Sequence, residues 1–249
     1  MRVIPGNHDY GEDGNHADIK NFDIFKRYFA HFHNGNMDYP NKDPMNGHLF
    51  VGFNSMEEYS KVNFARGKLG DEQIQNACDF IERQGDKKEG QKVIVCLHHH
   101  PFLFPDEGVL KRIGEKVGHC LEDSANFLEK IKNQGVDILL FGHDHRHLAF
   151  TNTEINTLYK IPYIFSAGKS TEKGYEYKVK KDGTADIPAP TTIADVSDNP
   201  YIQNPDDVAS EIEQIENEKW KEIPYGLFGR LIEINDDGGV ASETITFAS

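Results

Sequence analysis

Val93-Ile94-Val95-Cys96-Leu97-His98-His99-His100-Pro101 is the stretch that decides the fold. An apolar run ends abruptly at three histidines and a proline. Short runs of this kind fit a strand that is buried on both faces, as in the sheet of an α/β protein. The stretch therefore predicts a strand over residues 92–97 that delivers polar side chains to its carboxyl end.

Two further stretches have the same design. An apolar run at residues 136–141 leads into Gly142-His143-Asp144-His145, and residues 2–5, read as the end of a strand, lead into Gly6-Asn7-His8-Asp9. In open α/β sheets, ligand sites form at the carboxyl ends of strands. We therefore expect the three histidine-bearing loops to converge on one point.

Amphipathic helices are expected between these strands, at residues 19–33, 71–84 and 122–134. In the second helix, apolar side chains recur with helical spacing at Ile74, Ala77, Cys78 and Ile81. Asp71 is expected to be its N-cap, and Gly135 the C′ glycine of the third helix. Strands alternating with helices predict an α/β fold.

Residues 34–46 are read as a loop and 48–53 as a strand. After His147 we expect strands without helices between them, at residues 161–166 and 175–180, and a hairpin of residues 226–234 and 240–247. An acidic helix is expected at about 206–221. We expect one domain over residues 1–249, with an α/β part at 1–147 and a mainly β part at 148–249 that contains this helix.

The chain is acidic, with 41 Asp and Glu against 27 Lys and Arg and a net charge of −14. This charge argues against binding to nucleic acid or to an anionic membrane, but bound metal ions can still attract an anionic substrate. No run of apolar residues is long enough to span a membrane. The three cysteines lack CxxC spacing, which favours a reducing compartment, and no signal peptide is visible; both indicate a cytoplasmic protein.

Histidines gathered at strand ends predict a metal site, because neutral imidazole is a common ligand for transition metals. The side-chain oxygen of Asn7 can also ligate a metal. His8 can donate a proton, and Asp9 can hold its imidazole in place. Each loop alone could equally be a solvent-exposed turn, so the prediction depends on all three together.

The order GNHD, H-x-P and GH-x-H resembles the calcineurin-like metallophosphoesterases, which hydrolyse phosphate esters with two divalent metal ions. The resemblance implies an α/β/β/α sandwich and a small phosphorylated substrate, and leaves Mn, Fe, Zn and Ni as possible metals. It implies these roles: Asn7, His99 and His143 bind one metal, His145 binds the other, His8 is the general acid assisted by Asp9, and His100 faces the substrate. Gly67, Leu69 and Gln73 resemble a segment of cyclic-nucleotide-phosphodiesterase-like members, although helix packing explains them equally well.

Two earlier motifs of that family, D-x-H and G-D-x-x-D, do not occur in this sequence. Of seven usual metal ligands, four are present. We therefore expect a sandwich that lacks its N-terminal strands, and an enzyme that hydrolyses phosphomonoesters or phosphodiesters only when the missing half is supplied. A catalytically inactive remnant that acts as a binding or scaffold module, or an upstream half on a separate chain, are the alternatives.

Overall fold

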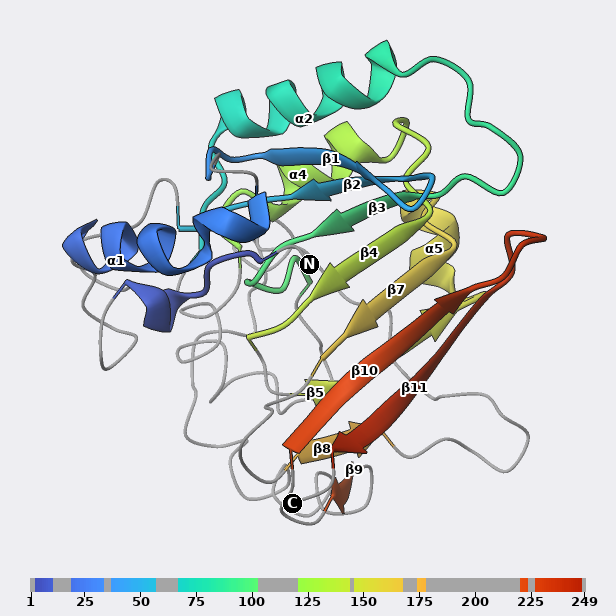
Figure 1. Cartoon of the computed structure of the whole chain (residues 1–249). Helices are drawn as coiled ribbons and strands as arrows, with labels where there is room; N and C mark the ends of the chain where they lie inside the picture. Colours follow the sequence, from blue (N-terminus) through green and yellow to red (C-terminus); the bar gives the residue numbers. More distant parts are fainter. Residues whose placement is uncertain are drawn as a thin grey trace, which may run out of the picture.

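The computed structural model describes residues 3–10, 19–33, 37–56, 67–102, 121–143, 146–167, 174–177, 220–223 and 227–247. Its centre is a six-stranded sheet with the order β1-β2-β3-β4-β7-β6 (Figure 1). The strands are β1 Asn41–Met45, β2 His48–Gly52, β3 Val93–Cys96, β4 Ile138–Phe141, β6 Ala149–Thr151 and β7 Tyr163–Ser166. The inner strands β2, β3, β4 and β7 are parallel, so their carboxyl ends share one edge.

Side chains of the parallel strands alternate between two apolar faces. In β3, Val93 and Val95 belong to the core on one face, and Ile94 and Cys96 belong to the core on the other. Because both faces are covered, the strand reads as a continuous apolar run. The prediction of a strand buried on both faces is confirmed.

Helices cover the first face and a hairpin covers the second (Figure 1). The helices of that face are α2 Asp71–Arg83, α4 Ser124–Ile131 and α5 Glu154–Tyr159. The hairpin consists of β10 Leu227–Ile234 and β11 Val240–Phe247. Its Ile232 and Ile234 pack on the sheet, so the described residues form an α/β sandwich.

The remaining described helix, 3-10 turns and strands lie outside these layers. Helix α1 Ile19–Phe29 continues into the 3-10 turn η2 Ala30–His33, and its Phe22 and Phe25 pack with Tyr10. The 3-10 turn η1 spans Asn7–Asp9. Strands β5 Arg146–His147, β8 Gly174–Tyr177 and β9 Trp220–Ile223 form a separate sheet.

Two sequence predictions about strands are wrong. Part of the expected loop at 34–46 is β1, which pairs with β2 across a turn in which Asn46 (φ 51°) and Gly47 (φ 84°) both have positive φ. Such turns favour Asn-Gly, and Pro44 is tolerated because β1 is an edge strand. The expected strand end at 2–5 is also wrong for Val3–Pro5, which lie outside the described strands, and the Tyr39 hydroxyl donates to the Val3 carbonyl (3.0 Å).

The helix predictions need three corrections. The N-cap of α2 is Gly70, not Asp71, and the carboxylate of Asp123 accepts the amides of Leu69 and Gly70. Helix α4 ends at Ile131, before a turn through 132–135, so Gly135 (φ 65°) is not its C′ residue. The expectation that no helices lie between the strands after residue 147 is wrong at α5, which lies between β6 and β7. Most of the expected acidic helix at 206–221 lies outside the described residues, and its last two positions begin β9.

Candidate metal centre

The histidine-bearing loops leave adjacent parallel strands and meet. Residues 97–101 follow β3, and Gly142 and His143 follow β4. The Gly142 amide donates to the His98 carbonyl (3.0 Å), which ties the two loops together. Turn η1 brings Asn7 to the same place, where its side chain is buried. The expected convergence is therefore present for these three loops.

Four side chains face one another at this point. His98 Nε2 lies 3.0 Å from Asn7 Oδ1 and 3.0 Å from His143 Nδ1. The ring of His99 lies 4.5 Å from that of His143, centroid to centroid. Candidate ligand atoms of His98, His99 and His143 all lie within 4.8 Å of one another. This geometry brings together Asn7, His99 and His143 as the sequence predicted, and adds His98, which it did not predict.

His99 and His100 are held by contacts inside the protein. His99 is fully buried, and its Nδ1 lies 2.7 Å from the hydroxyl of Ser55. His100 is only 2% exposed, and its Nδ1 donates to the Phe102 carbonyl (2.6 Å). The predicted contact of His100 with substrate stays a prediction. Asp144 and His145 lie outside the described residues, so the role of His145 also stays a prediction.

The backbone is shaped to admit these rings. A Cβ on Gly6 would lie 2.8 Å from His98 Cε1, and a Cβ on Gly67 would overlap the ring of His99. His143 has a φ of 69°, in the left-handed region that non-glycine residues rarely adopt. Strained backbone of this kind is concentrated at functional sites, where the surrounding structure holds it in place.

His8 and Asp9 follow Asn7 in the η1 turn. His8 is exposed, so its imidazole can meet a ligand from solvent. The Asp9 carboxylate accepts the Gly6 amide (2.8 Å) and closes the η1 turn. Burial raises the pKa of Asp9 above its ordinary value, while the Gly6 amide and the nearby His8 act in the opposite direction. Proton donation by His8 with help from Asp9 stays a prediction.

A family model of calcineurin-like phosphoesterases matches residues 1–147, more than half of the chain. The chain belongs to the calcineurin-like phosphoesterase family. Comparison with curated proteins gave no match. The family hydrolyses phosphoesters and binds divalent metal ions, which agrees with a histidine cluster at the carboxyl ends of β3 and β4.

The cluster in this calcineurin-like phosphoesterase has suitable donors for a metal ion. Three imidazoles and an amide oxygen suit zinc, iron, manganese or nickel. Two donor atoms bound to one ion at about 2.0–2.1 Å lie about 3 Å apart, and His98 Nε2 is 3.0 Å from both Asn7 Oδ1 and His143 Nδ1. The residues present therefore fit a divalent transition metal.

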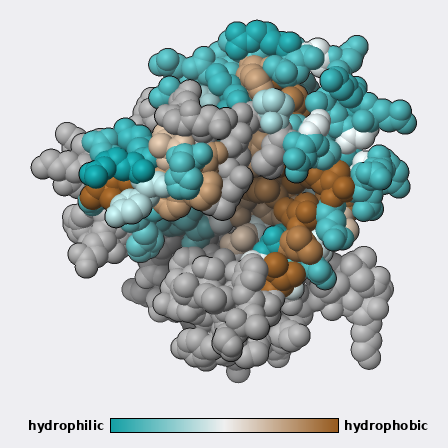
Figure 2. Space-filling model, viewed as in Figure 1, coloured by the Kyte–Doolittle hydropathy of each residue, from teal (hydrophilic) through white to brown (hydrophobic). Residues whose placement is uncertain are grey.

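A pocket of about 280 Å³ adjoins His98 on the hairpin side of the sheet. Its lining includes Ile4, Cys96, His98, Leu140, Phe165 and Ile232. Figure 2 shows apolar side chains gathered on this face of the molecule. Arg230 in β10 borders the pocket, where it donates to the Ser166 carbonyl (2.8 Å) and the Ser242 hydroxyl (3.1 Å). The hairpin thus adds a fixed cation near His98 that motif spacing did not reveal.

No helix among the described residues is both long and apolar enough to cross a membrane.

The segment with Gly67, Leu69 and Gln73 has a clear packing role. The Gln73 side chain donates to the carbonyls of Asn54 (3.0 Å) and Leu69 (2.8 Å) and accepts the Asn54 amide (2.8 Å). These bonds join α2 to the end of β2.

Proposed function

We propose that this chain supplies the histidine ligands of a metal centre that hydrolyses phosphate esters with a metal-activated water. The observation that carries the proposal is the meeting of Asn7, His98, His99 and His143 at the carboxyl ends of the parallel strands. Gathering imidazoles that are partly or fully buried costs free energy unless their nitrogens have partners. A metal ion uses several of them at once.

Each residue has a distinct task in this proposal. Asn7, His99 and His143 would hold one ion, and His145 would hold a second. His98 joins the first set, because its Nε2 is within hydrogen-bond distance of both Asn7 and His143. A divalent ion held by these residues would polarise a phosphate and would lower the pKa of a bound water from about 16 towards 7.

The residues outside the metal set complete the chemistry. His8 is exposed beside the cluster and protonates the leaving oxygen, which is worth roughly 10²–10⁴-fold in rate. Asp9 fixes the turn that carries His8. His100 contacts the substrate. The substrate is a small phosphorylated molecule, because the net charge of −14 disfavours nucleic acid.

Turnover in this proposal also requires the carboxylates of D-x-H and G-D-x-x-D, which this sequence does not contain. These carboxylates would complete the ligand set of the ions and would help to position a nucleophilic water. The alternative is a chain that binds metal or a partner without catalysis. Three intact histidine loops favour the enzyme, since a binding module has no need to keep them.

The test joins residues 1–249 to an upstream segment that carries both missing motifs. Hydrolysis of bis-nitrophenyl phosphate with Mn²⁺ or Zn²⁺ is measured for the joined protein, for the 249-residue chain alone, and for the joined protein with His143→Ala. We expect activity from the joined protein only. Brisk turnover by the 249-residue chain alone would contradict the need for the carboxylates, and an inactive joined protein with a full metal content would favour the binding module.

The general acid is tested in the joined protein with His8→Ala. Its metal content should stay near normal. Its kcat should fall more for an alkyl phosphate, whose leaving oxygen needs a proton, than for nitrophenyl phosphate, whose leaving group does not. The control is His99→Ala, which should lose metal and slow both substrates alike. Loss of metal in His8→Ala, or equal slowing of both substrates, would show that His8 is structural.

A further inference from the structure

We propose that Ser55 is the positioning residue of His99, and that its hydroxyl fixes the tautomer in which Nε2 can bind a metal. The inference rests on the metal site proposed above. Ser55 follows the carboxyl end of β2, a strand that bears none of the three histidine motifs. Sequence motifs did not point to it, and the contact spans 44 residues of chain.

The geometry at the hydroxyl is compatible with the Nδ1–H tautomer. Ser55 Oγ accepts the backbone amide of His99 (3.3 Å) and lies 2.7 Å from His99 Nδ1. A hydroxyl oxygen has two lone pairs, so it can accept both the amide N–H and an Nδ1–H. A neutral imidazole carries one proton, and with that proton on Nδ1 the lone pair is on Nε2. Nε2 is then the nitrogen that binds a metal.

Ser55 is itself held rigidly, as a positioning residue must be. Its side chain is fully buried, and its carbonyl accepts the Lys68 amide (2.8 Å). The preceding Asn54 donates through its side chain to the Tyr10 hydroxyl (2.8 Å), and Asn54 Oδ1 accepts the amide of Met56 (3.0 Å). Tyr10 directly follows the η1 turn. One buried network therefore links the turn that carries Asn7 to the residue that holds His99.

Gly67 also restrains the His99 ring. A Cβ on Gly67 would overlap this ring, so the backbone there lies in direct contact with it. The Glu122 amide donates to the Gly67 carbonyl (2.8 Å), which fixes that backbone. His99 therefore contacts both a hydroxyl and a backbone surface, and has little freedom to turn. Partners of this kind typically change metal affinity 10–100-fold.

Ser124 offers a matched control. It is also a fully buried serine, it lies at the start of α4, and within the described residues its hydroxyl has no hydrogen-bond partner. Ser124→Ala and Ser55→Ala thus remove the same atom from equally buried sites. Only Ser55→Ala removes a contact with a histidine of the cluster.

The experiment titrates the full 249-residue chain and the two variants with Co²⁺, whose visible absorption reports both affinity and coordination geometry. Ser55→Ala should bind Co²⁺ roughly 10–100-fold more weakly, with an altered spectrum. Ser124→Ala should match the wild type. Unchanged affinity and spectrum in Ser55→Ala would overturn the proposal.

A second measurement needs no metal. The ¹⁵N chemical shifts of the His99 ring in the metal-free chain should show the Nδ1–H tautomer, and Ser55→Ala should show a mixture of tautomers. An Nε2–H tautomer in the wild type would overturn the role of Ser55. A chain that shows the Nδ1–H tautomer but binds no Co²⁺ would instead refute the metal centre, so the two failures are distinguishable.

Discussion

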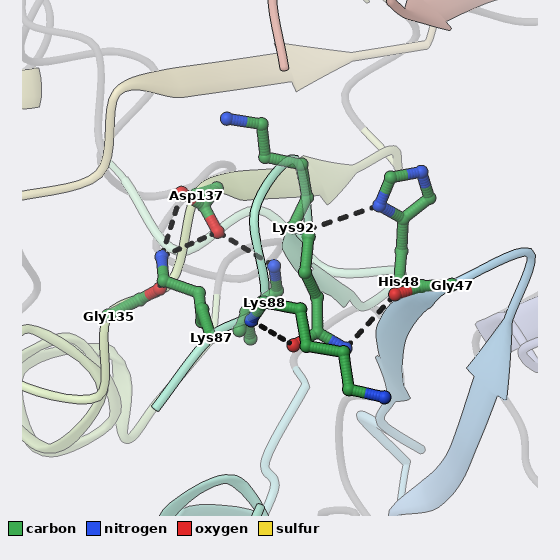
Figure 3. Close-up of polar contacts among 9 residues, drawn as sticks. Gly47, His48, Lys87, Lys88, Lys92, Gly135 and Asp137 are labelled. Carbon is green, nitrogen blue, oxygen red and sulfur yellow. Dashed lines mark hydrogen bonds and ion pairs between the residues drawn. The ribbon is translucent and has the colours of Figure 1, made fainter. Parts of the chain in front are cut away.

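Histidines and charged side chains lie at both ends of the parallel sheet, and the two ends use them differently. At the amino end, His48 Nδ1 accepts the Lys92 amide (3.1 Å), and the Asp137 carboxylate joins the Val93 amide (2.7 Å) to the Lys87 ammonium group (2.9 Å) (Figure 3). These contacts tie loops together. At the carboxyl end, the ring nitrogens of His98 and His143 face each other instead.

The difference teaches how to separate structural from functional polar residues. A structural histidine such as His48 bonds to one backbone amide at the start of a strand. The histidines of the cluster meet side chains from distant loops. One of them, His143, has a positive φ, and two glycines make room for the other rings. Forming such a cluster costs free energy, and a ligand bound by several of the histidines would offset this cost.

The largest effect on the free energy of unfolding should come from Gly67→Ala, at the carboxyl end of the sheet. The new Cβ overlaps the buried ring of His99, so the ring or the backbone must move, at a cost of about 3 kcal/mol. Metal affinity should fall as well. The matched control is Gly85→Ala after α2, where φ is 70° and no atom lies within 4 Å. Its cost should be about 1 kcal/mol of backbone strain alone.

Urea denaturation and Zn²⁺ titration of both glycine variants check this prediction. Equal destabilisation by Gly67→Ala and Gly85→Ala would mean that the His99 ring has room to move, which would weaken the description of a tightly held site.

The second-largest effect on the free energy of unfolding should come from Asp137→Ala, at the amino end of the sheet. It leaves the buried Val93 amide without its acceptor and should lower the free energy of unfolding by about 2 kcal/mol. Metal affinity should stay unchanged, because Asp137 lies at the other end of the sheet. Asp137→Asn keeps an acceptor for Val93 and should cost less.

The measurement is again urea denaturation, with Zn²⁺ affinity measured in parallel. A weakened Zn²⁺ affinity in Asp137→Ala would mean that the two ends of the sheet are coupled. It would contradict a purely structural role for the polar residues at the amino end.

The smallest effect is a pH dependence at Asp123, which binds the amides before α2. Burial raises the pKa of Asp123 above its ordinary value of 3.8, against the lowering effect of those amides. The folded state therefore binds a proton more readily than the unfolded state. Stability relative to Asp123→Asn should rise as the pH falls through the raised pKa towards 3.8.

Urea denaturation of the wild type and Asp123→Asn at several pH values between 7 and 4 gives the difference directly, and the common effects of acid cancel. If the wild type instead loses stability relative to Asp123→Asn on acidification, the amides rather than burial determine the direction of the pKa shift of Asp123.

The central sheet was predictable because a strand that is buried on both faces is apolar at every position. Val93–Cys96 and Ile138–Phe141 are apolar throughout, and their ends supply the histidines. Strand β1 was missed because an edge strand need not be apolar: it reads Asn-Lys-Asp-Pro-Met. Its signal was the Asn46-Gly47 turn, which fixes the hairpin with β2.

Helix α5 was missed for a different reason. It has only six residues, too few for a clear apolar period. Side-chain bonds hold it in place: Asn156 donates to the carbonyls of Phe150 (3.1 Å) and Ile161 (2.9 Å), and also accepts the Thr153 amide (2.9 Å). The Thr153-x-x-Asn156 pattern was the available signal.

In the candidate site, motif spacing located the loops but not the direction of each ring. Three consecutive histidines leave open which of them face the centre, and the sequence did not predict the place of His98. The contacts of His99 with Ser55 and Gly67 join segments that are far apart in the chain. Only the fold brings them together.

The most direct test of the account compares one histidine from each end of the sheet. Zn²⁺ binding to the 249-residue chain is measured by titration calorimetry for the wild type, His143→Ala and His48→Ala. We predict one tightly bound ion per chain in the wild type and in His48→Ala, and affinity weakened more than about 100-fold in His143→Ala. Equal weakening by both substitutions, or two ions per chain that are both lost on His145→Ala, would contradict a metal centre built on Asn7, His98, His99 and His143.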